Sequence, residues 1–228
     1  MNYIEYRKKD IEKKTAEMHI YPVDILITGI TGAGKSSTLN SIFEQNIAKV
    51  GTGVNPETMD INEHKLSKLT RFWDTPGLGD GIEKDKIHSK KIIDFLYKTY
   101  EKNNIRYGFI DLILVIIDGS SRDMGTTYNL LNKIIIPNIS KDRILIAINQ
   151  CDMAMKGRHW DSINNKPDET LTKFLDEKAY SIQKRIKEST NINVKLPIYY
   201  SAYYKYNIHK LMDLIIDNIP TQRRTIKI

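Results

Sequence analysis

The sequence predicts an α/β fold in three layers, with helices on both faces of a mainly parallel, six-stranded sheet. Two continuous apolar runs of strand length, 111–117 and 143–148, suit central strands that are buried on both faces. Strand-like and helix-like segments alternate along the chain, which is typical of sheets built from strand–helix–strand units. The first predicted strand, residues 23–28, ends in a glycine-rich turn that leads into a helix. A length of 228 residues fits one domain with a small appendage.

The N-terminal stretch, residues 1–20, is predicted to form a charged helix ahead of this domain. Ile4, Ile11 and Met18 recur every seven residues and make a narrow apolar stripe. Pro22 favours an end to the helix, because the residue before a proline is disfavoured in the helical region. The stripe is expected either to pack on the domain's own flank or to pair with a partner helix.

The remaining elements follow in alternation. After the glycine-rich turn, Leu39, Ile42 and Phe43 lie on one face of the next predicted helix. Strands are predicted over 23–28, 58–66, 68–73, 111–117, 143–148 and 196–200. Helices are predicted over 35–46, 83–103, 126–136, 168–189 and 208–219, with loops over 48–57 and 154–167.

These elements divide the chain into a helical extension over 1–20, a domain over 21–220 and a tail over 221–228. We expect the tail, with Arg223 and Arg224, to fray into solvent as chain ends commonly do.

Composition excludes several classes of protein. Apolar residues make up 40% and charged residues 28% of the chain, which fits a folded globular protein. The single cysteine, Cys151, excludes a disulfide framework and a cysteine-rich zinc site, and it favours a reducing compartment such as the cytoplasm. No apolar run is long enough to span a membrane, and residues 1–14 lack the apolar core of a secretory signal.

The net charge is +7, which allows an anionic partner such as RNA or a membrane surface. The basic residues are spread along the chain with Asp and Glu between them, however. This spacing favours ordinary solvated faces over a dedicated basic surface.

The strongest motif lies at residues 29–36, which read GITGAGKS and match the P-loop pattern G-x-x-x-x-G-K-[ST]. Glycines let successive backbone N–H groups face inward, and the following helix adds partial positive charge, so the loop can cradle phosphate. Lys35 can reach the terminal phosphates, and the Ser36 hydroxyl can bind Mg²⁺. A strand before the motif and a helix after it provide the required context.

A second motif, Asp74-Thr75-Pro76-Gly77, follows a predicted strand. A carboxylate at the end of a strand can hold Mg²⁺ through water, and the Gly77 N–H can meet a γ-phosphate. D-x-x-G is common by itself, and its place after a P-loop makes it a specific signal.

A third motif, Asn149-Gln150-Cys151-Asp152, ends another predicted strand, and Ser201-Ala202 follows the last one. With these four motifs in order, the chain resembles P-loop small GTPases of the TrmE–Era–septin-like class, and most of all bacterial Era-related stand-alone G-domain proteins. The resemblance covers residues 23–219. It implies a Ras-like G domain that binds GTP or GDP with Mg²⁺.

The resemblance implies a role for each matching residue. Asp152 accepts hydrogen bonds from guanine N1–H and N2–H₂, which adenine lacks; Asn149 bonds the base and the P-loop, and the Ala202 N–H meets guanine O6. The residues implied to contact the nucleotide are Thr31, Gly32, Ala33, Gly34, Lys35, Ser36, Ser37, Asn149, Gln150, Asp152, Ser201 and Ala202. The residues implied to act in hydrolysis are Lys35, Thr58 and Gly77, and those implied to hold the metal are Ser36, Thr58 and Asp74. Thr52 is the alternative to Thr58.

The chain departs from the family pattern beside the base. Gln150 replaces the usual lysine of N-K-x-D, and Tyr203 stands where S-A-K gives a lysine. Guanine preference is expected to survive, since Asp152 carries it, and one flank of the base is expected to be aromatic.

The chain also departs from the pattern beside the phosphates. Leu78 occupies the position where Ras-like proteins have a water-orienting glutamine, which implies slow intrinsic hydrolysis. Thr31 replaces a glycine, and Gly32 replaces the asparagine of potassium-dependent relatives, which argues against a potassium mechanism. An acidic loop follows, and it serves either to position water or simply as a solvated helix start; its residues are Asp80, Glu83 and Asp85.

The sequence therefore predicts a GTP-binding protein that hydrolyses GTP slowly and switches conformation. Two alternatives remain open. One is a module that dimerises when GTP is bound and uses little hydrolysis, and the other is a GTPase associated with RNA or the ribosome. Use of ATP instead requires Asp152 to face away from the base.

Overall fold

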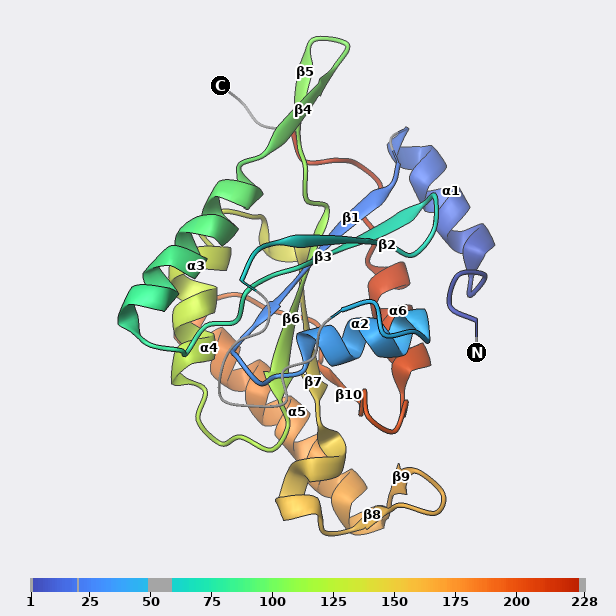
Figure 1. The fold of residues 1–228 in the computed structure, drawn as a ribbon, viewed down its shortest axis with the longest axis vertical. Coiled ribbons are helices and arrows are strands. Elements are labelled where there is room, and N and C mark those ends of the chain that lie inside the picture. The colour runs from blue at the N-terminus through green and yellow to red at the C-terminus, as the bar shows by residue number, and fades with distance from the viewer. Residues whose placement is uncertain (1, 20, 49–58, 226–228) are drawn as a thin grey trace.

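A computed structural model describes residues 2–19, 21–48 and 59–225, and its centre is the predicted six-stranded sheet. The strands lie in the order β10-β7-β6-β1-β3-β2 (Figure 1). All neighbouring pairs are parallel except β2 and β3. The fold class predicted from the sequence is confirmed.

The strands of the sheet are β1 (Val23–Gly29), β2 (Asn62–Lys65), β3 (Thr70–Asp74), β6 (Leu112–Asp118), β7 (Ile144–Asn149) and β10 (Ile198–Tyr199). The helices are α1 (Lys8–Met18), α2 (Lys35–Phe43), α3 (Ile82–Leu96), α4 (Gly125–Leu130), α5 (Glu169–Thr190) and α6 (Ile208–Asp217). Helix α4 continues into a π-helical turn over Leu131–Ile135.

The sheet separates two apolar cores. Alternate residues of β1 face opposite sides, so Ile25 and Ile27 pack with α1, α2 and α6, whereas Leu26 packs with α3, α4 and α5. Figure 1 shows these two sets of helices on either side of the sheet. Strands β6 and β7 are buried along almost their whole length, as their continuous apolar runs predicted.

The C-terminal end predicted for the helix over 83–103 is wrong. Helix α3 ends at Leu96, and residues 99–108 form a hairpin of β4 (Thr99–Lys102) and β5 (Ile105–Gly108), which projects from the body in Figure 1. Asn103 and Asn104 both have positive φ, at 53° and 60°, which is the conformation of a two-residue hairpin turn. Asparagine tolerates this conformation better than other non-glycine residues, so the turn overrides the helical pattern.

The N-terminal helix packs on the domain's own flank. Ile11 and Met18 of the stripe are buried in the core shared with α6, whereas Ile4 is 47% exposed. The Arg7 guanidinium fixes the start of α1 to α6, since it lies 2.9 Å from the Asp213 carboxylate and 2.7 Å from that of Asp217.

The expectation of a frayed tail is wrong for the described residues 221–225. The Arg223 guanidinium is buried and pairs with the carboxylates of Asp111 at 3.3 Å and Asp24 at 3.6 Å. Arg224 donates hydrogen bonds to the carbonyls of Asn138 and Leu96, at 2.8 and 2.6 Å. The reason is electrostatic, because two buried carboxylates near the start of β1 and β6 require a counter-charge.

No helix in the described ranges is both long and apolar enough to cross a lipid bilayer.

Candidate functional site

The glycine-rich turn joins β1 directly to the N-terminus of α2. Gly32 and Gly34 have φ values of 81° and 85°, in the left-handed region that other residues rarely adopt. A Cβ atom at Gly34 would also lie 2.2 Å from the side-chain nitrogen of Asn149. Both the backbone conformation and the close packing therefore require glycine at position 34.

Lys35 is buried at the centre of this turn. Its Nζ donates to the carbonyl oxygens of Ile30 at 3.0 Å and Gly29 at 3.3 Å, so the side chain curls back over its own loop. Burial lowers the pKa of Lys35 to about 8, and the carboxylates of Asp74 and Asp80 partly oppose that shift. The turn thus holds a cation in a partly desolvated setting, where attraction to phosphate is stronger than in water.

Ser36 and Asp74 meet beside Lys35, at the ends of α2 and β3 that face the turn. The Ser36 hydroxyl donates to Oδ2 of Asp74 at 2.9 Å, and the Asp74 carboxylate is buried. A hydroxyl and a carboxylate are hard oxygen ligands that fit Mg²⁺, an ion that usually takes its other ligands from phosphate and water. In the part of the chain that the structure describes, no three His, Cys, Asp or Glu side chains gather into a separate metal site. Thr58 and its alternative Thr52 lie outside the described residues.

Residues 77–78 lie directly against the P-loop. The Thr31 N–H donates to the Leu78 carbonyl at 2.8 Å, and the Leu78 N–H donates to the Gly29 carbonyl at 3.4 Å. A Cβ atom at Gly77 would lie 2.3 Å from the Thr31 hydroxyl, so only glycine fits there. On the other side, Nδ1–H of the buried His88 donates to the Gly77 carbonyl at 2.8 Å. His88 could not be singled out from the sequence, because its contact with Gly77 depends on α3 folding back over the loop.

Asn149 connects three parts of the site. Its side-chain amide donates to the Ala33 carbonyl at 3.0 Å, and its side-chain oxygen accepts from the Ala202 N–H at 3.0 Å. Gln150 adds a second link, since its amide donates to the Gly32 carbonyl at 2.7 Å. The P-loop, the 149–152 turn and the 201–202 turn are therefore held in fixed relative positions.

Asp152 lines a hollow of about 330 Å³ between these turns. The hollow is lined by Gly34, Ser37, Asn149, Gln150, Asp152, Met153, Ala202, Tyr203 and Tyr204. The Asp152 side chain is buried, and its Oδ1 has no hydrogen-bond partner among the described residues. A buried carboxylate oxygen without a donor is costly, so the hollow is suited to a ligand that brings N–H donors.

Aromatic side chains border this hollow on one side. Tyr203 is 83% exposed and its ring lies edge-on to Tyr204, 4.9 Å away between ring centres. Behind Tyr204, at 5.1 Å, lies the indole of Trp160 from the short hairpin of β8 (Trp160–Asp161) and β9 (Lys166–Pro167). The sequence predicts Tyr203 beside the hollow, but it does not predict the contact of Tyr204 with Trp160.

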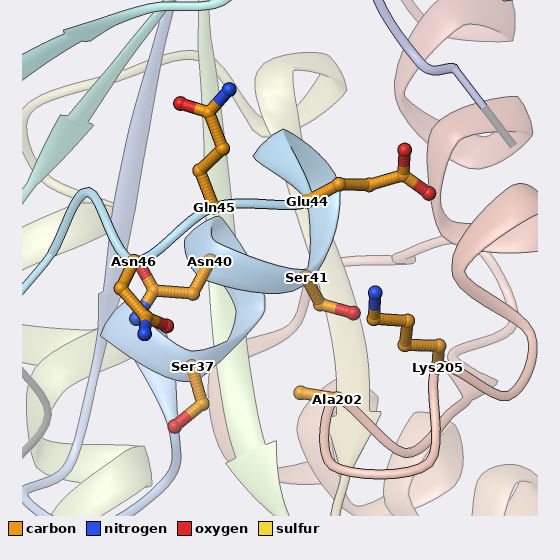
Figure 2. Close-up of a pocket in the computed structure, with 8 residues that line it drawn as sticks. All are labelled: Ser37, Asn40, Ser41, Glu44, Gln45, Asn46, Ala202 and Lys205. Atoms are coloured by element: carbon orange, nitrogen blue, oxygen red, sulfur yellow. The ribbon is translucent and has the colours of Figure 1, made fainter.

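A second hollow, of about 320 Å³, adjoins the first and shares Ser37 and Ala202 with it. Figure 2 shows it between α2 and the turn after Ala202, with the side chains of Ser41 and Lys205 pointing toward each other across it. Ser37 thus lies between the two hollows, at the first turn of α2.

The described residues of the predicted site do come together, at the carboxyl ends of β1, β3, β7 and β10. Ser201 is among them, but its groups serve the loop itself, because its hydroxyl accepts from the Tyr204 N–H at 3.1 Å and its N–H donates to the Tyr206 carbonyl at 3.1 Å.

Comparison with known proteins agrees with this geometry. A family model described as 50S ribosome-binding GTPase matches residues 24–150, more than half of the chain. The chain belongs to this GTPase family. The resemblance inferred from the motifs is confirmed.

Two relatives illustrate how far the similarity of sequence extends. GTPase Der of Leptospira borgpetersenii is 23% identical over 222 residues, which cover 96% of this chain and 40% of that protein. Translocase of chloroplast 126 of Physcomitrium patens is 38% identical over 81 residues, which cover 34% of this chain and 7% of that protein. The chain spans less than half the length of these relatives.

Solved structures share the fold. Toc33 from Arabidopsis thaliana, in complex with Mg²⁺ and GMPPNP, matches with a TM-score of 0.63 at 14% identity, over 100% of this chain and 99% of that one. Era from Aquifex aeolicus, bound to GDP and AlF₄⁻, matches with a TM-score of 0.57 at 16% identity, over 88% of this chain and 58% of that one.

Proposed function

We propose that this chain binds GTP and GDP with Mg²⁺ and hydrolyses GTP slowly to GDP and phosphate. The observation that carries the proposal is the Asp152 carboxylate, which is buried in the hollow beside the P-loop with one oxygen lacking a donor. Guanine offers N1–H and N2–H₂ to such an oxygen, whereas adenine offers neither and would leave the carboxylate buried without a partner.

The nucleotide's phosphates bind along the P-loop. Backbone N–H groups at the start of α2 and the Lys35 ammonium neutralise their charge. For that contact Lys35 must exchange its bonds to the Gly29 and Ile30 carbonyls for bonds to phosphate oxygens. Ser36 and Asp74 hold the metal, which when bound neutralises charge on the β- and γ-phosphates.

Hydrolysis is an in-line attack of water on the γ-phosphorus, and the bond to the GDP oxygen breaks. The chain contributes position and charge, through Lys35 and, when they turn to the γ-phosphate, Gly77 and Thr58. Leu78 is an apolar, buried side chain that cannot orient the water, so turnover is slow. Loss of the γ-phosphate releases the segments that contact it, which makes the protein a switch.

The test is phosphate release from GTP, with and without Mg²⁺. Wild-type protein should release phosphate only with Mg²⁺, and Lys35→Ala should abolish release because it removes the buried cation. Lys86→Ala is the matched control, since Lys86 is an exposed lysine whose salt bridge to Glu83 lies outside the hollow. Phosphate release near the wild-type rate in Lys35→Ala would contradict the assignment of this site.

A second candidate is a module whose output is GTP-dependent pairing of two copies. It is favoured by Leu78 at the water-orienting position and by a neighbour in fold whose structure is titled "Dimerization is important for the GTPase activity of chloroplast translocon components atToc33 and psToc159". Light scattering with GDP and with a non-hydrolysable GTP analogue separates the candidates. A mass that doubles with the analogue, without phosphate release from GTP, would support the module.

A further inference from the structure

The loop between β3 and α3 closes over the phosphate end of the candidate site. Leu78 pairs with Ile30 of the P-loop as an isolated parallel bridge, and Gly77 packs against Thr31. The next acidic residue is Asp80, whose Oδ2 accepts a hydrogen bond of 2.6 Å from the Thr31 hydroxyl. Two segments far apart in the sequence thus meet through backbone and side-chain contacts at one point.

The loop is held in this position from behind by the first turns of α3. The Asp85 carboxylate accepts from the N–H groups of Gly79 and Asp80, at 2.8 and 3.2 Å. His88, one turn later, donates to the Gly77 carbonyl. The turn that carries Asp80 is therefore held against the P-loop by hydrogen bonds to Asp85 and His88 of α3.

Asp80 also lies within the electrostatic reach of Lys35, because its charge opposes the fall in the pKa of that lysine. In this kind of site the P-loop lysine pairs with the β- and γ-phosphates. The Asp80 carboxylate acts on that same lysine and is bonded to a hydroxyl of the same loop. Of the other two acidic residues of the loop, Asp85 caps backbone groups, and Glu83 is exposed and paired with Lys86.

We propose that Asp80 is a latch that stands in for the γ-phosphate and so makes the chain prefer GDP to GTP. With GDP bound, Asp80 keeps its hydrogen bond to Thr31 and its attraction to Lys35. The γ-phosphate of GTP repels the carboxylate and must displace it, so part of the binding energy is spent on opening the loop. This inference rests on the proposed function, and it gives Thr31, which departs from the family pattern, a specific partner.

The test is the ratio of the dissociation constants for a non-hydrolysable GTP analogue and for GDP. Asp80→Asn keeps the shape and removes the charge, and it should lower this ratio by about tenfold, a common size for coupling between two sites. Glu83→Gln is the matched control, because it removes one acidic charge from the same segment without touching the P-loop, and its ratio should equal that of wild type.

Variants of Thr31 test the other side of the latch. Thr31→Val removes the hydroxyl and should also lower the ratio, whereas Thr31→Ser keeps the hydroxyl and should preserve it. Once the charge of Asp80 is gone, removing the Thr31 hydroxyl should change the ratio little. The double variant should therefore lower the ratio by much less than the sum of the two single effects.

The outcomes separate the two proposals. Wild-type protein that binds neither nucleotide would overturn the proposed function. Wild-type protein that binds both, with an unchanged ratio in Asp80→Asn, would overturn the latch alone. Slower phosphate release in Asp80→Asn at the same ratio would also overturn it, because Asp80 would then act on the attacking water.

Discussion

At the scale of single residues, the proposed selectivity for guanine depends on one carboxylate and its surroundings. Asp152 is buried beside Cys151, and the turn that carries it is fixed to the P-loop by Asn149 and Gln150. Gln150 makes this link from a left-handed backbone conformation, at φ 58°. Gln150 therefore tethers the 149–152 turn to the P-loop, and in the proposed function the Asp152 carboxylate recognises the base.

Asp152→Asn should exchange guanine for xanthine selectivity. The amide offers a donor to the second keto group of xanthine, and it removes charge-assisted hydrogen bonds to guanine that are worth about 1.5–3 kcal/mol, or roughly 10- to 100-fold in affinity. Competition of GTP and xanthosine triphosphate for a fluorescent nucleotide measures the change, with Asp94→Asn, an exposed aspartate on α3, as the control. If the variant keeps wild-type GTP selectivity, the base is recognised elsewhere.

The residues that could be predicted from the sequence are those whose geometry is local. The P-loop, Asp74 to Gly77 and Asn149 to Asp152 are short motifs at strand ends, where the backbone alone fixes the position of each side chain. The bond between Thr31 and Asp80 and the contact of Trp160 with Tyr204 join segments 49 and 44 positions apart, so they appear only once the chain has folded.

At the scale of elements, a buried charge cluster attaches the C-terminal segment to the sheet. Arg223 lies between Asp24 and Asp111, and Arg71 donates to the Asp24 carboxylate at 2.5 Å. Burial raises the pKa of Asp111 to about 6, and the positive charges of Arg223 and Arg143 act against that shift. Arg223 is the cation shared by both carboxylates of the cluster.

Arg223→Ala should destabilise the fold by about 3–5 kcal/mol at pH 7.5, because it removes the cation that lies 3.3 Å from the buried Asp111 carboxylate. The pKa of Asp111 is raised in the folded state, and it rises further when Arg223 is removed. At pH 5 the carboxyl of the folded variant is therefore largely protonated and needs no counter-charge. The loss of unfolding free energy caused by Arg223→Ala should thus be smaller at pH 5 than at pH 7.5. Urea unfolding at both pH values measures it. Arg106→Ala, an exposed arginine of the hairpin, is the control, and an equal loss at the two pH values would exclude Asp111 as the responsible group.

The elements that were predicted correctly are those with a long apolar pattern, such as β6, β7 and α5. The hairpin of β4 and β5 was missed because Tyr100 extends the apolar spacing of α3, whereas Asn103 and Asn104 reverse the chain. The attachment of Arg223 was missed because a tail of polar residues reads as solvated until its partners near the starts of β1 and β6 are known.

At the scale of the whole molecule, the two ends of the sheet have different tasks. The carboxyl ends of β1, β3 and β7 carry the P-loop and the hollow lined by Asp152, and the amino ends of β1 and β6 carry the charge cluster that attaches residues 221–225. Helix α1 lies on the flank beside α6 (Figure 1) and buries Ile11 and Met18 of its apolar stripe. In the described residues, this stripe is used within the chain, which favours the nucleotide face as the surface for any pairing of two copies.

The most direct test of the account is calorimetric titration of the wild-type protein with GDP and with ADP, each with and without Mg²⁺. The buried Asp152 carboxylate and the Ser36–Asp74 pair predict Mg²⁺-dependent binding of GDP that is at least about a hundredfold tighter than that of ADP. Equal affinity for GDP and ADP, or no binding of either, would contradict the proposed guanine-nucleotide site.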